Sequence, residues 1–251
     1  QRQLESYDRS QGIWHGTGKT IPVDQLGDEA TWREALSNIR IARDIRLENK
    51  WYPAVVLEVG QNEARLGIEG VEEDEDGHWV PAKDVQWARK RNNDGSLAKK
   101  ARVAGDLVAV GEVVHVRRMT VDNDGSFIGW TLRQVPKVQG GFVAMDVDTG
   151  RVIAMLGGFS HQASVFNRAT QAIRQPGSSV KPSVYAAALD SGYTPATIVV
   201  DAPIEINTPQ GLWRPRNSSN KFYGPAPLRT GIEQSRNLMT IRIAKEVGMD
   251  T

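Results

Sequence analysis

Residues 175–182 read Gln175-Pro176-Gly177-Ser178-Ser179-Val180-Lys181-Pro182. Ser178 and Lys181 stand three positions apart and face each other across one helical turn, so the amine can take the proton of a hydroxyl that attacks a carbonyl. An apolar stripe then predicts a helix that stops at residues 191–192: Val180, Val184, Ala187, Ala188 and Leu189. The stretch therefore predicts a nucleophilic serine at a helix N-terminus, where unpaired N–H groups favour developing negative charge.

A bare Ser-x-x-Lys pattern is weak evidence, because the chain contains two more at residues 96–99 and 218–221. Both lie in polar segments rich in turn-forming residues, and no apolar stripe follows them. For Ser178 itself the alternative is a helix N-cap beside a solvated first-turn lysine.

A second pattern supports the catalytic interpretation. Ser235 and Asn237 lie where one predicted helical stretch ends and another begins. Their hydroxyl and carboxamide can relay a proton and hold a substrate amide or the lysine amine. The alternative is again a helix cap, and residues 218–220 match the same Ser-x-Asn pattern.

From residue 51 on, the first half of the chain shows the two-residue period that is typical of β-strands. Residues 28–41 predict a short amphipathic helix, and residues 1–30, with their many turn formers, predict an irregular lead-in. Five strands are predicted at 51–59, 64–68, 78–81, 107–116 and 127–135, with a turn at 122–125 and a solvated acidic loop at 72–77. This spacing favours a small closed barrel of the OB type.

A change of pattern near residues 136–140 predicts a domain boundary. Beyond it a hairpin is expected at 142–146 and 151–156, followed by a helix, a long loop and another helix. The predicted domains are a lead-in with a short helix at 1–45, an OB-like barrel at 46–137 and a further domain at 138–251.

Composition narrows the functional classes. The 251 residues carry 31 Lys+Arg and 30 Asp+Glu, a net charge of +1, which argues against a dedicated nucleic-acid binder. The absence of cysteine excludes disulfides, thiolate metal sites and a cysteine nucleophile. Four histidines, His15, His78, His115 and His161, show no metal-ligand spacing, so neither a metal nor another cofactor is predicted. Residues 16–20 imitate the end of a phosphate-binding loop, but Ile13 stands where that motif needs glycine.

Several segments in order resemble class A, bifunctional penicillin-binding proteins of the Gram-negative type. Besides the Ser-x-x-Lys and Ser-x-Asn motifs, they are residues 141–146, 149–158, 166–169, 174–182, 213–217 and 223–225. The similar region covers about residues 138–251. In this family an OB-like domain lies between the glycosyltransferase and transpeptidase domains, which is where the barrel-like segment falls.

The resemblance implies an α+β multidomain protein, a small OB-like β-barrel followed by the N-terminal part of a β-lactamase/transpeptidase-like α/β domain. It implies a D,D-transpeptidase of peptidoglycan synthesis in which Ser178 is the nucleophile, Lys181 the base, Ser235 the proton carrier and Asn237 the substrate-orienting group. Trp213 and Tyr223 are expected to line the substrate groove, with simple packing as the alternative.

The implied partners are peptidoglycan stem peptides, glycan strands derived from lipid II, and β-lactam antibiotics, which would acylate the serine. The implied location is the periplasmic face of the bacterial inner membrane, reached through an N-terminal anchor that this chain lacks. The family's Lys-Thr/Ser-Gly motif is also missing, so the chain is expected to be a fragment, lacking the glycosyltransferase domain, with weak or no activity of its own.

Three rival interpretations remain. In the first, the barrel is a non-catalytic docking module for a regulatory protein. In the second, it binds single-stranded nucleic acid through Trp79, Trp87 and Trp130, but the acidic run at 72–76 and the overall neutrality of the chain argue against this. We therefore expect no nucleic acid, and these tryptophans are then core residues. A β-lactamase would need a deacylating carboxylate, and none can be assigned.

Overall fold

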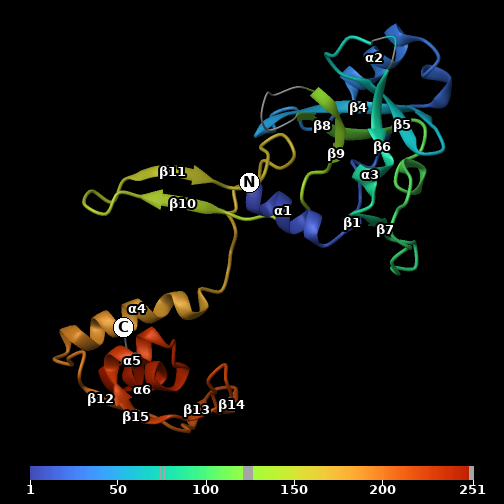
Figure 1. The fold of residues 1–251 in the computed structure, drawn as a ribbon. Helices are drawn as coiled ribbons and strands as arrows, with labels where there is room; N and C mark the ends of the chain where they lie inside the picture. The colour runs from blue at the N-terminus through green and yellow to red at the C-terminus, as the bar shows by residue number, and fades with distance from the viewer. Residues whose placement is uncertain (74, 76, 121–126, 249–251) are drawn as a thin grey trace. The chain divides into compact units, whose positions relative to one another are not determined.

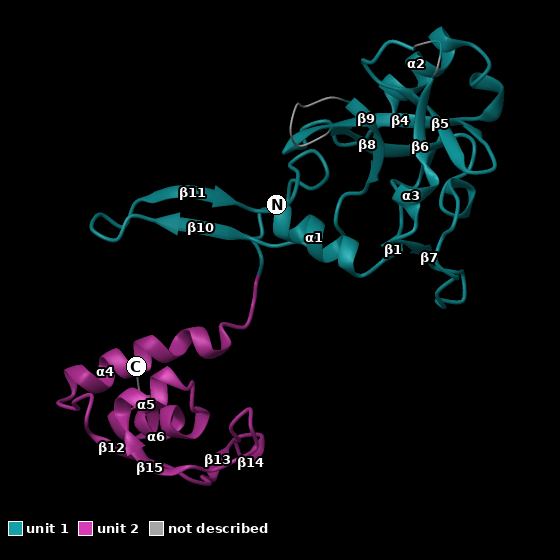
Figure 2. Ribbon diagram, in the orientation of Figure 1, with its two compact units in different colours: residues 1–172 teal, residues 173–251 magenta. Residues whose placement is uncertain are grey.

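The computed structural model describes residues 1–73, 75, 77–120 and 127–248. The chain forms two compact units, residues 1–172 and residues 173–251 (Figures 1 and 2).

Unit 1 is built around one antiparallel sheet. Its central strand β4 (Asn49–Val59) pairs with β5 (Glu63–Ile68) and β8 (Glu112–Thr120), and these pair in turn with β6 (His78–Pro81) and β9 (Phe127–Arg133). Two short strands add to the sheet: β2 (Lys19–Thr20) pairs with β8, and β3 (Arg46–Leu47) pairs with β4. The sheet curls until β6 and β9 lie side by side (Figure 1). There Trp130 Nε1 donates to His78 Nδ1 at 3.3 Å. The curled sheet encloses a core of alternating inward residues, so the OB-like fold is confirmed.

Shorter elements surround this sheet. Helix α2 (Glu29–Asn38) begins at Asp28, whose carboxylate accepts from the Thr31 N–H at 2.9 Å, and it buries Trp32 and Leu36. The remaining elements are a parallel pair of β1 (Ile13–Trp14) and β7 (Arg89–Lys90), helix α3 (Ala82–Val85), and the 3₁₀ turns η1 (Val23–Gln25) and η2 (Ala104–Asp106).

The predicted irregular lead-in is wrong at its start, because residues Arg2–Ser10 form helix α1. The turn-forming residues begin only at Gly12, and the helix is held by contacts with residues far along the chain. Its buried Asp8 accepts from Gln134 Nε2 at 2.7 Å and from the Lys137 N–H at 3.1 Å.

The strand predicted at 107–116 starts late. Leu107 and Val108 are buried in the turn after η2, and β8 begins only at Glu112, after Gly111 takes a left-handed conformation with φ of 86°. Apolar content alone does not separate a buried turn from a strand. The turn predicted at 122–125 lies outside the described residues.

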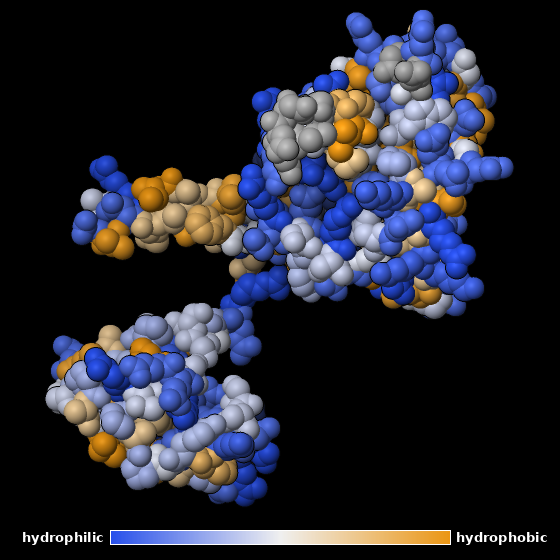
Figure 3. Space-filling model, in the orientation of Figure 1, coloured by the Kyte–Doolittle hydropathy of each residue, from blue (hydrophilic) through white to orange (hydrophobic). Residues whose placement is uncertain are grey.

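The last part of unit 1 contains a predicted hairpin, formed by β10 (Phe142–Met145) and β11 (Val152–Leu156). Apolar side chains are exposed along both strands (Figure 3). After it, Phe159 packs on Trp51 with ring centroids 5.5 Å apart, and Asp44 accepts from Ser160 Oγ at 2.5 Å. Because these residues pack on the barrel, unit 1 extends to residue 172, beyond the domain boundary predicted at 137/138.

The described residues of unit 2, 173–248, form three helices and four short strands. They are the 3₁₀ turn η3 (Gly177–Val180), α4 (Lys181–Asp190), β12 (Ile198–Asp201), β13 (Ile206–Thr208), β14 (Gly211–Trp213), β15 (Gly224–Pro227), α5 (Leu228–Glu233) and α6 (Asn237–Val247). Strand β12 pairs with β15, and β13 with β14, so the long loop predicted between two helices is wrong. The core joins α4 to α6 through Tyr185, Ala188, Met239 and Ile243.

Among the described residues, no helix has the length and apolar character that a membrane span requires.

Candidate active site

Three side chains from separate segments of unit 2 form a connected row. Ser178 comes from η3, Lys181 is the first residue of α4, and Ser235 lies between α5 and α6. Lys181 Nζ donates to Ser235 Oγ at 2.9 Å, and Ser235 Oγ donates to Ser178 Oγ at 3.2 Å. A proton can therefore pass between the first serine and the lysine through the second serine.

Lys181 is buried, with 7% of its surface exposed. Its Nζ also donates to the Ser235 carbonyl and to Asn237 Oδ1, each at 2.7 Å. Three acceptors match the three donors of an ammonium group. Burial lowers the pKa of Lys181 below its usual range and so makes the neutral amine easier to reach.

The serine and the lysine are arranged differently from the simple facing pair that the sequence suggests. Ser178 lies in a 3₁₀ turn that runs directly into α4, and Pro182 occupies the first turn of that helix. Within the described part of the chain, the hydrogen bond of Ser178 goes to Ser235 and none joins it to Lys181. The predicted residues Ser178, Lys181, Ser235 and Asn237 are thus brought together, with Ser235 in the middle.

The two predicted groove aromatics have different positions. Tyr223 lines a pocket of about 210 Å³ together with Ser235 and Arg236, and the Arg236 guanidinium lies 3.2 Å from its ring centroid. Trp213 is exposed on β14, opposite Ile206, and does not line this pocket. The structure therefore brings Tyr223 beside Ser235 but does not bring Trp213 there.

The other Ser-x-x-Lys segments are turns. Ser96 closes a turn on the Asp94 carboxylate, with its N–H donating at 2.9 Å. In the segment 218–221, Asn220 is left-handed with φ of 55°, and the Lys221 N–H donates to Ser219 Oγ at 3.3 Å. Neither arrangement is a helical turn that places a serine beside a lysine.

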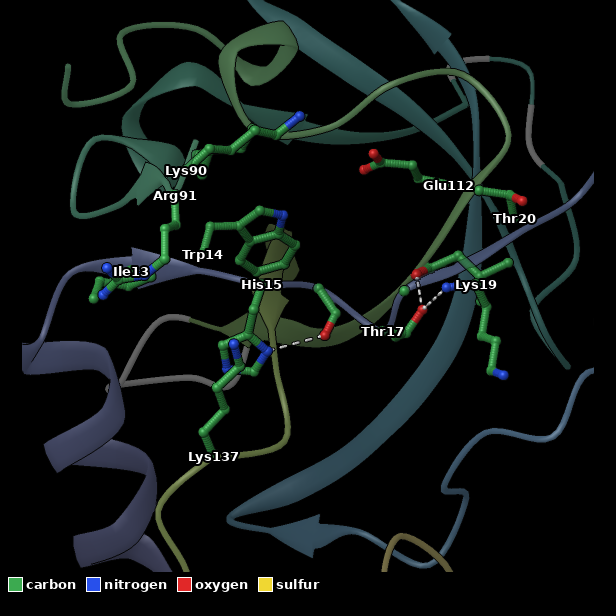
Figure 4. A pocket seen from close by; sticks show the side chains of 14 residues that line it. Ile13, Trp14, His15, Thr17, Lys19, Thr20, Lys90, Arg91, Glu112 and Lys137 are labelled. Atoms are coloured by element: carbon green, nitrogen blue, oxygen red, sulfur yellow. Dashed lines mark hydrogen bonds between the residues drawn. The ribbon is translucent and has the colours of Figure 1, made fainter. Parts of the chain in front are cut away.

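A larger pocket, of about 460 Å³, lies in unit 1 and contains the segment that imitates a phosphate-binding loop (Figure 4). There Thr17 Oγ1 donates to the Val113 carbonyl at 2.5 Å and accepts from the Lys19 N–H at 3.2 Å. The segment leads into strand β2 rather than into a helix, so the strand–loop–helix cradle of a phosphate-binding loop is absent there.

In the described ranges, no group of three His, Asp or Glu side chains is placed to hold a metal ion. Trp130 is enclosed in the barrel core, with Tyr52 and His78 against its ring. It is therefore a core residue and is not available for stacking on a base.

Sequence reasoning missed the residues that hold the 235–237 loop. Asp201 ends β12, and Asn217 lies in the segment before β15; both are buried, and both connect to the loop through hydrogen bonds. Asn217 lies in one of the segments that carry the family resemblance, but nothing in that segment indicates its contacts. For Asp201 the signal is a carboxylate on the buried face of an alternating strand.

Comparison with known proteins gives a family match for each half of the chain. Residues 14–138 match the penicillin-binding protein OB-like domain, and residues 140–251 match the penicillin binding protein transpeptidase domain. Together the two matches define a class in which an OB-like module precedes a transpeptidase module.

The chain belongs to the penicillin-binding protein family. It is similar to penicillin-binding protein 1A of Vibrio cholerae, with 41% identity over 98% of this chain and 29% of that protein, and to penicillin-binding protein 1A of Rickettsia bellii, with 37% identity over 98% of this chain and 28% of that protein. The crystal structure of penicillin-binding protein 1A from Haemophilus influenzae matches 99% of this chain and 33% of that chain, with a TM-score of 0.71 and 28% identity. The chain thus spans about a third or less of the proteins it matches.

Proposed function

We propose that this chain is the part of a peptidoglycan synthase in which Ser178 becomes acylated. The observation that carries the proposal is the row Ser178–Ser235–Lys181, with oxygen–oxygen and oxygen–nitrogen distances of 3.2 and 2.9 Å. The substrate class is a stem peptide ending in D-Ala-D-Ala, as in the family that the chain belongs to.

In the proposed reaction, Ser178 Oγ attacks the carbonyl carbon of the penultimate D-alanine. Its proton moves to Ser235 Oγ while the Ser235 proton moves to neutral Lys181, so charge and protons balance. The reverse movement protonates the nitrogen of the leaving D-alanine when the C–N bond breaks. An amine of a neighbouring stem peptide then attacks the ester carbonyl, and the C–O bond to Ser178 breaks as the C–N bond of the cross-link forms. The amine gives up one proton to Lys181, and Ser178 Oγ regains a proton through Ser235.

A β-lactam enters the same path, because its ring amide takes the place of the D-Ala-D-Ala bond. The opened ring stays attached to the enzyme, so Ser178 remains acylated. Asn237 Oδ1 holds Lys181, and Tyr223 provides a wall for the substrate beside Ser235. Trp213 stays a proposed groove residue, exposed on β14 and outside the pocket that contains Ser235.

The experiment is labelling with a fluorescent penicillin, followed by a denaturing gel and intact mass. It compares the unaltered chain with Ser178→Ala and with Ser179→Ala, a matched change in the same turn. We expect a covalent adduct in the unaltered and Ser179→Ala chains and none in Ser178→Ala. The same set is made in a chain extended to the length of its relatives, and an absence of labelling in both lengths would overturn the proposal.

We also propose the domain bounds, the cellular location and the second substrate, from the sequence pattern and from the family to which the chain belongs. We place the junction between the lead-in and the barrel at 45/46 and that between the barrel and the transpeptidase part at 137/138. We place the protein at the periplasmic face of the inner membrane, with glycan strands derived from lipid II as the second substrate. Docking of a regulatory protein on the OB-like barrel is tested by mixing the chain with candidate periplasmic proteins and, as a control, with an oligonucleotide.

A further inference from the structure

A buried polar cluster lies beside the 235–237 loop, and the proposed reaction does not use it. Its centre is Asp201, which has no exposed surface. One carboxylate oxygen accepts from Asn217 Nδ2 at 2.8 Å, and the other pairs with Arg236 Nη1 at 3.0 Å. A buried charge is tolerated when it is paired and hydrogen-bonded in this way.

Asn217 is fully used by its neighbours. Its Nδ2 also donates to the Lys221 carbonyl at 2.9 Å, while its Oδ1 accepts from the N–H groups of Asn237 at 2.8 Å and Leu238 at 3.3 Å. Two donors and two acceptor positions exhaust a carboxamide, so its orientation is fixed. Asn217 thereby caps α6, because Arg236, the N-cap residue of that helix, makes no side-chain cap hydrogen bond.

These contacts hold Asn237 from two sides. Its backbone N–H is held by the Asn217 side chain, and its own Nδ2 donates to the Arg216 carbonyl at 3.0 Å. The amide nitrogen is therefore engaged, and the amide oxygen points to Lys181 Nζ, 2.7 Å away.

Ser235 is held from its C-terminal side. The next residue, Arg236, is fixed through its side chain to Asp201 and through its N–H to the Gly231 carbonyl at 2.8 Å. Between Gly231 and Arg236 the chain turns through Ser235 in a left-handed conformation, with φ of 51°. This conformation presents both the carbonyl and the hydroxyl of Ser235 to Lys181.

We propose that Asn217, held by Asp201, is a positioning residue that keeps the oxygens of Ser235 and Asn237 on Lys181. Neither Asn217 nor Asp201 touches the reacting atoms. The inference rests on the proposed function, because its measure is the rate at which Ser178 is acylated.

The test separates the rate of acylation from the amount of folded protein. Labelling with fluorescent penicillin is followed over time at several concentrations, which gives the non-covalent dissociation constant, the acylation rate constant and the final extent. Asn217→Ala removes the side chain that accepts from the N–H groups of Asn237 and Leu238. We expect the acylation rate constant to fall roughly tenfold to 10²-fold. The dissociation constant and the final extent are expected to stay within about twofold, because misplacement slows the chemical step without removing the binding groove.

The matched control is Asn207→Ala, an exposed asparagine of β13 in the same unit, which is expected to label as the unaltered chain does. A merely structural role gives the opposite pattern in Asn217→Ala. The final extent falls with the folded fraction, and the folded remainder reacts at the original rate. That pattern, or an unchanged rate at full extent, overturns the inference.

A charge exchange gives a second test that does not depend on removing a side chain. Asn217→Asp places a carboxylate against buried Asp201, and the repulsion is expected to slow acylation at least as much as Asn217→Ala does. In the double variant Asn217→Asp/Asp201→Asn the amide introduced at position 201 can donate to the carboxylate introduced at position 217 and still accept from Arg236. We expect the double variant to react at least threefold faster than Asn217→Asp; a double variant as slow as or slower than the single one overturns the coupling.

The proposed function and the positioning role of Asn217 are tested separately. All rates are measured in whichever chain length labels at Ser178. If unaltered protein labels there and Asn217→Ala reacts normally, only the positioning role is wrong. If neither length labels, the proposed function is wrong and the positioning role falls with it.

Discussion

Ser235 combines a strained backbone with a proposed chemical role, so two substitutions at this position separate stability from activity. Ser235→Ala and Ser235→Gly both remove the hydroxyl that connects Ser178 to Lys181. The lysine keeps the Ser235 carbonyl and Asn237 Oδ1 as acceptors, each at 2.7 Å, and so stays in place. Loss of one positioned proton carrier costs about 10²–10⁴-fold in rate, and we expect the acylation rate to fall by that factor in both variants.

Their stabilities are expected to differ. A left-handed residue with a Cβ costs about 1–2 kcal/mol, and Ser235 and an alanine at φ of 51° both carry this cost. Glycine avoids it but loses about 0.5–1 kcal/mol through the greater freedom of the unfolded chain. Ser235→Gly is therefore expected to be about 0.5–1 kcal/mol more stable than Ser235→Ala, although both are equally poor in acylation.

Acylation is measured with fluorescent penicillin, and stability by hydrogen exchange of the α6 amides, which reports unfolding of unit 2 alone. Ser183→Ala, an exposed position of α4, is the matched control for both. Variants that acylate within about threefold of the unaltered protein would refute the relay through Ser235. If α6 is no better protected with glycine than with alanine, the strain argument is wrong.

Three further outcomes are expected. Because burial lowers the pKa of Lys181 and the reaction needs its neutral form, acylation is expected to speed up as the pH rises and to reach half its maximum below pH 10.5; a flat profile from pH 6 to 10 contradicts this. Burial lowers the pKa of His115 below 6.5, so the unfolded chain takes up the proton first and the free energy of unfolding of unit 1 is expected to fall below pH 6.5, less steeply in His115→Gln, as urea titrations at pH 7 and 5 would show. Leu36→Ala removes a side chain with no exposed surface and is expected to cost about 2–5 kcal/mol in the same titration, whereas Val23→Ala, at a position 66% exposed, is expected to cost less than about 0.5 kcal/mol.

The local patterns of the sequence predict most of the barrel. Strands β4, β5, β6 and β9 were expected within a few residues of their observed bounds, because short runs of strand-forming residues between turn-forming residues mark strands. Helix α1 was not expected, since its buried Asp8 depends on Gln134 and Lys137, far along the chain. Such partners have no local signature.

The same division applies to the site. Ser178, Lys181, Ser235 and Asn237 belong to short motifs whose spacing can be seen in the sequence, and their chemical roles stay predictions until acylation is measured. Asn217 and Asp201 are separated by sixteen positions and meet only after β12 and the following segments have folded. The sequence thus indicates candidates for the chemistry, while the residues that orient these candidates depend on the tertiary fold.

The contacts of Asp8 also concern how the barrel is joined to the rest of the chain. Helix α1 enters the barrel and residues 134–137 leave it, and the Asp8 carboxylate joins these two ends at 2.7 and 3.1 Å. A module whose entry and exit lie together can be inserted into or removed from a host chain without separating the host's own segments. The two ends of the segment 12–133 therefore lie side by side, close enough for a short loop to span them. Removing the segment would also remove Trp51 and Asp44, which hold Phe159 and Ser160, so the chain after the barrel depends on it.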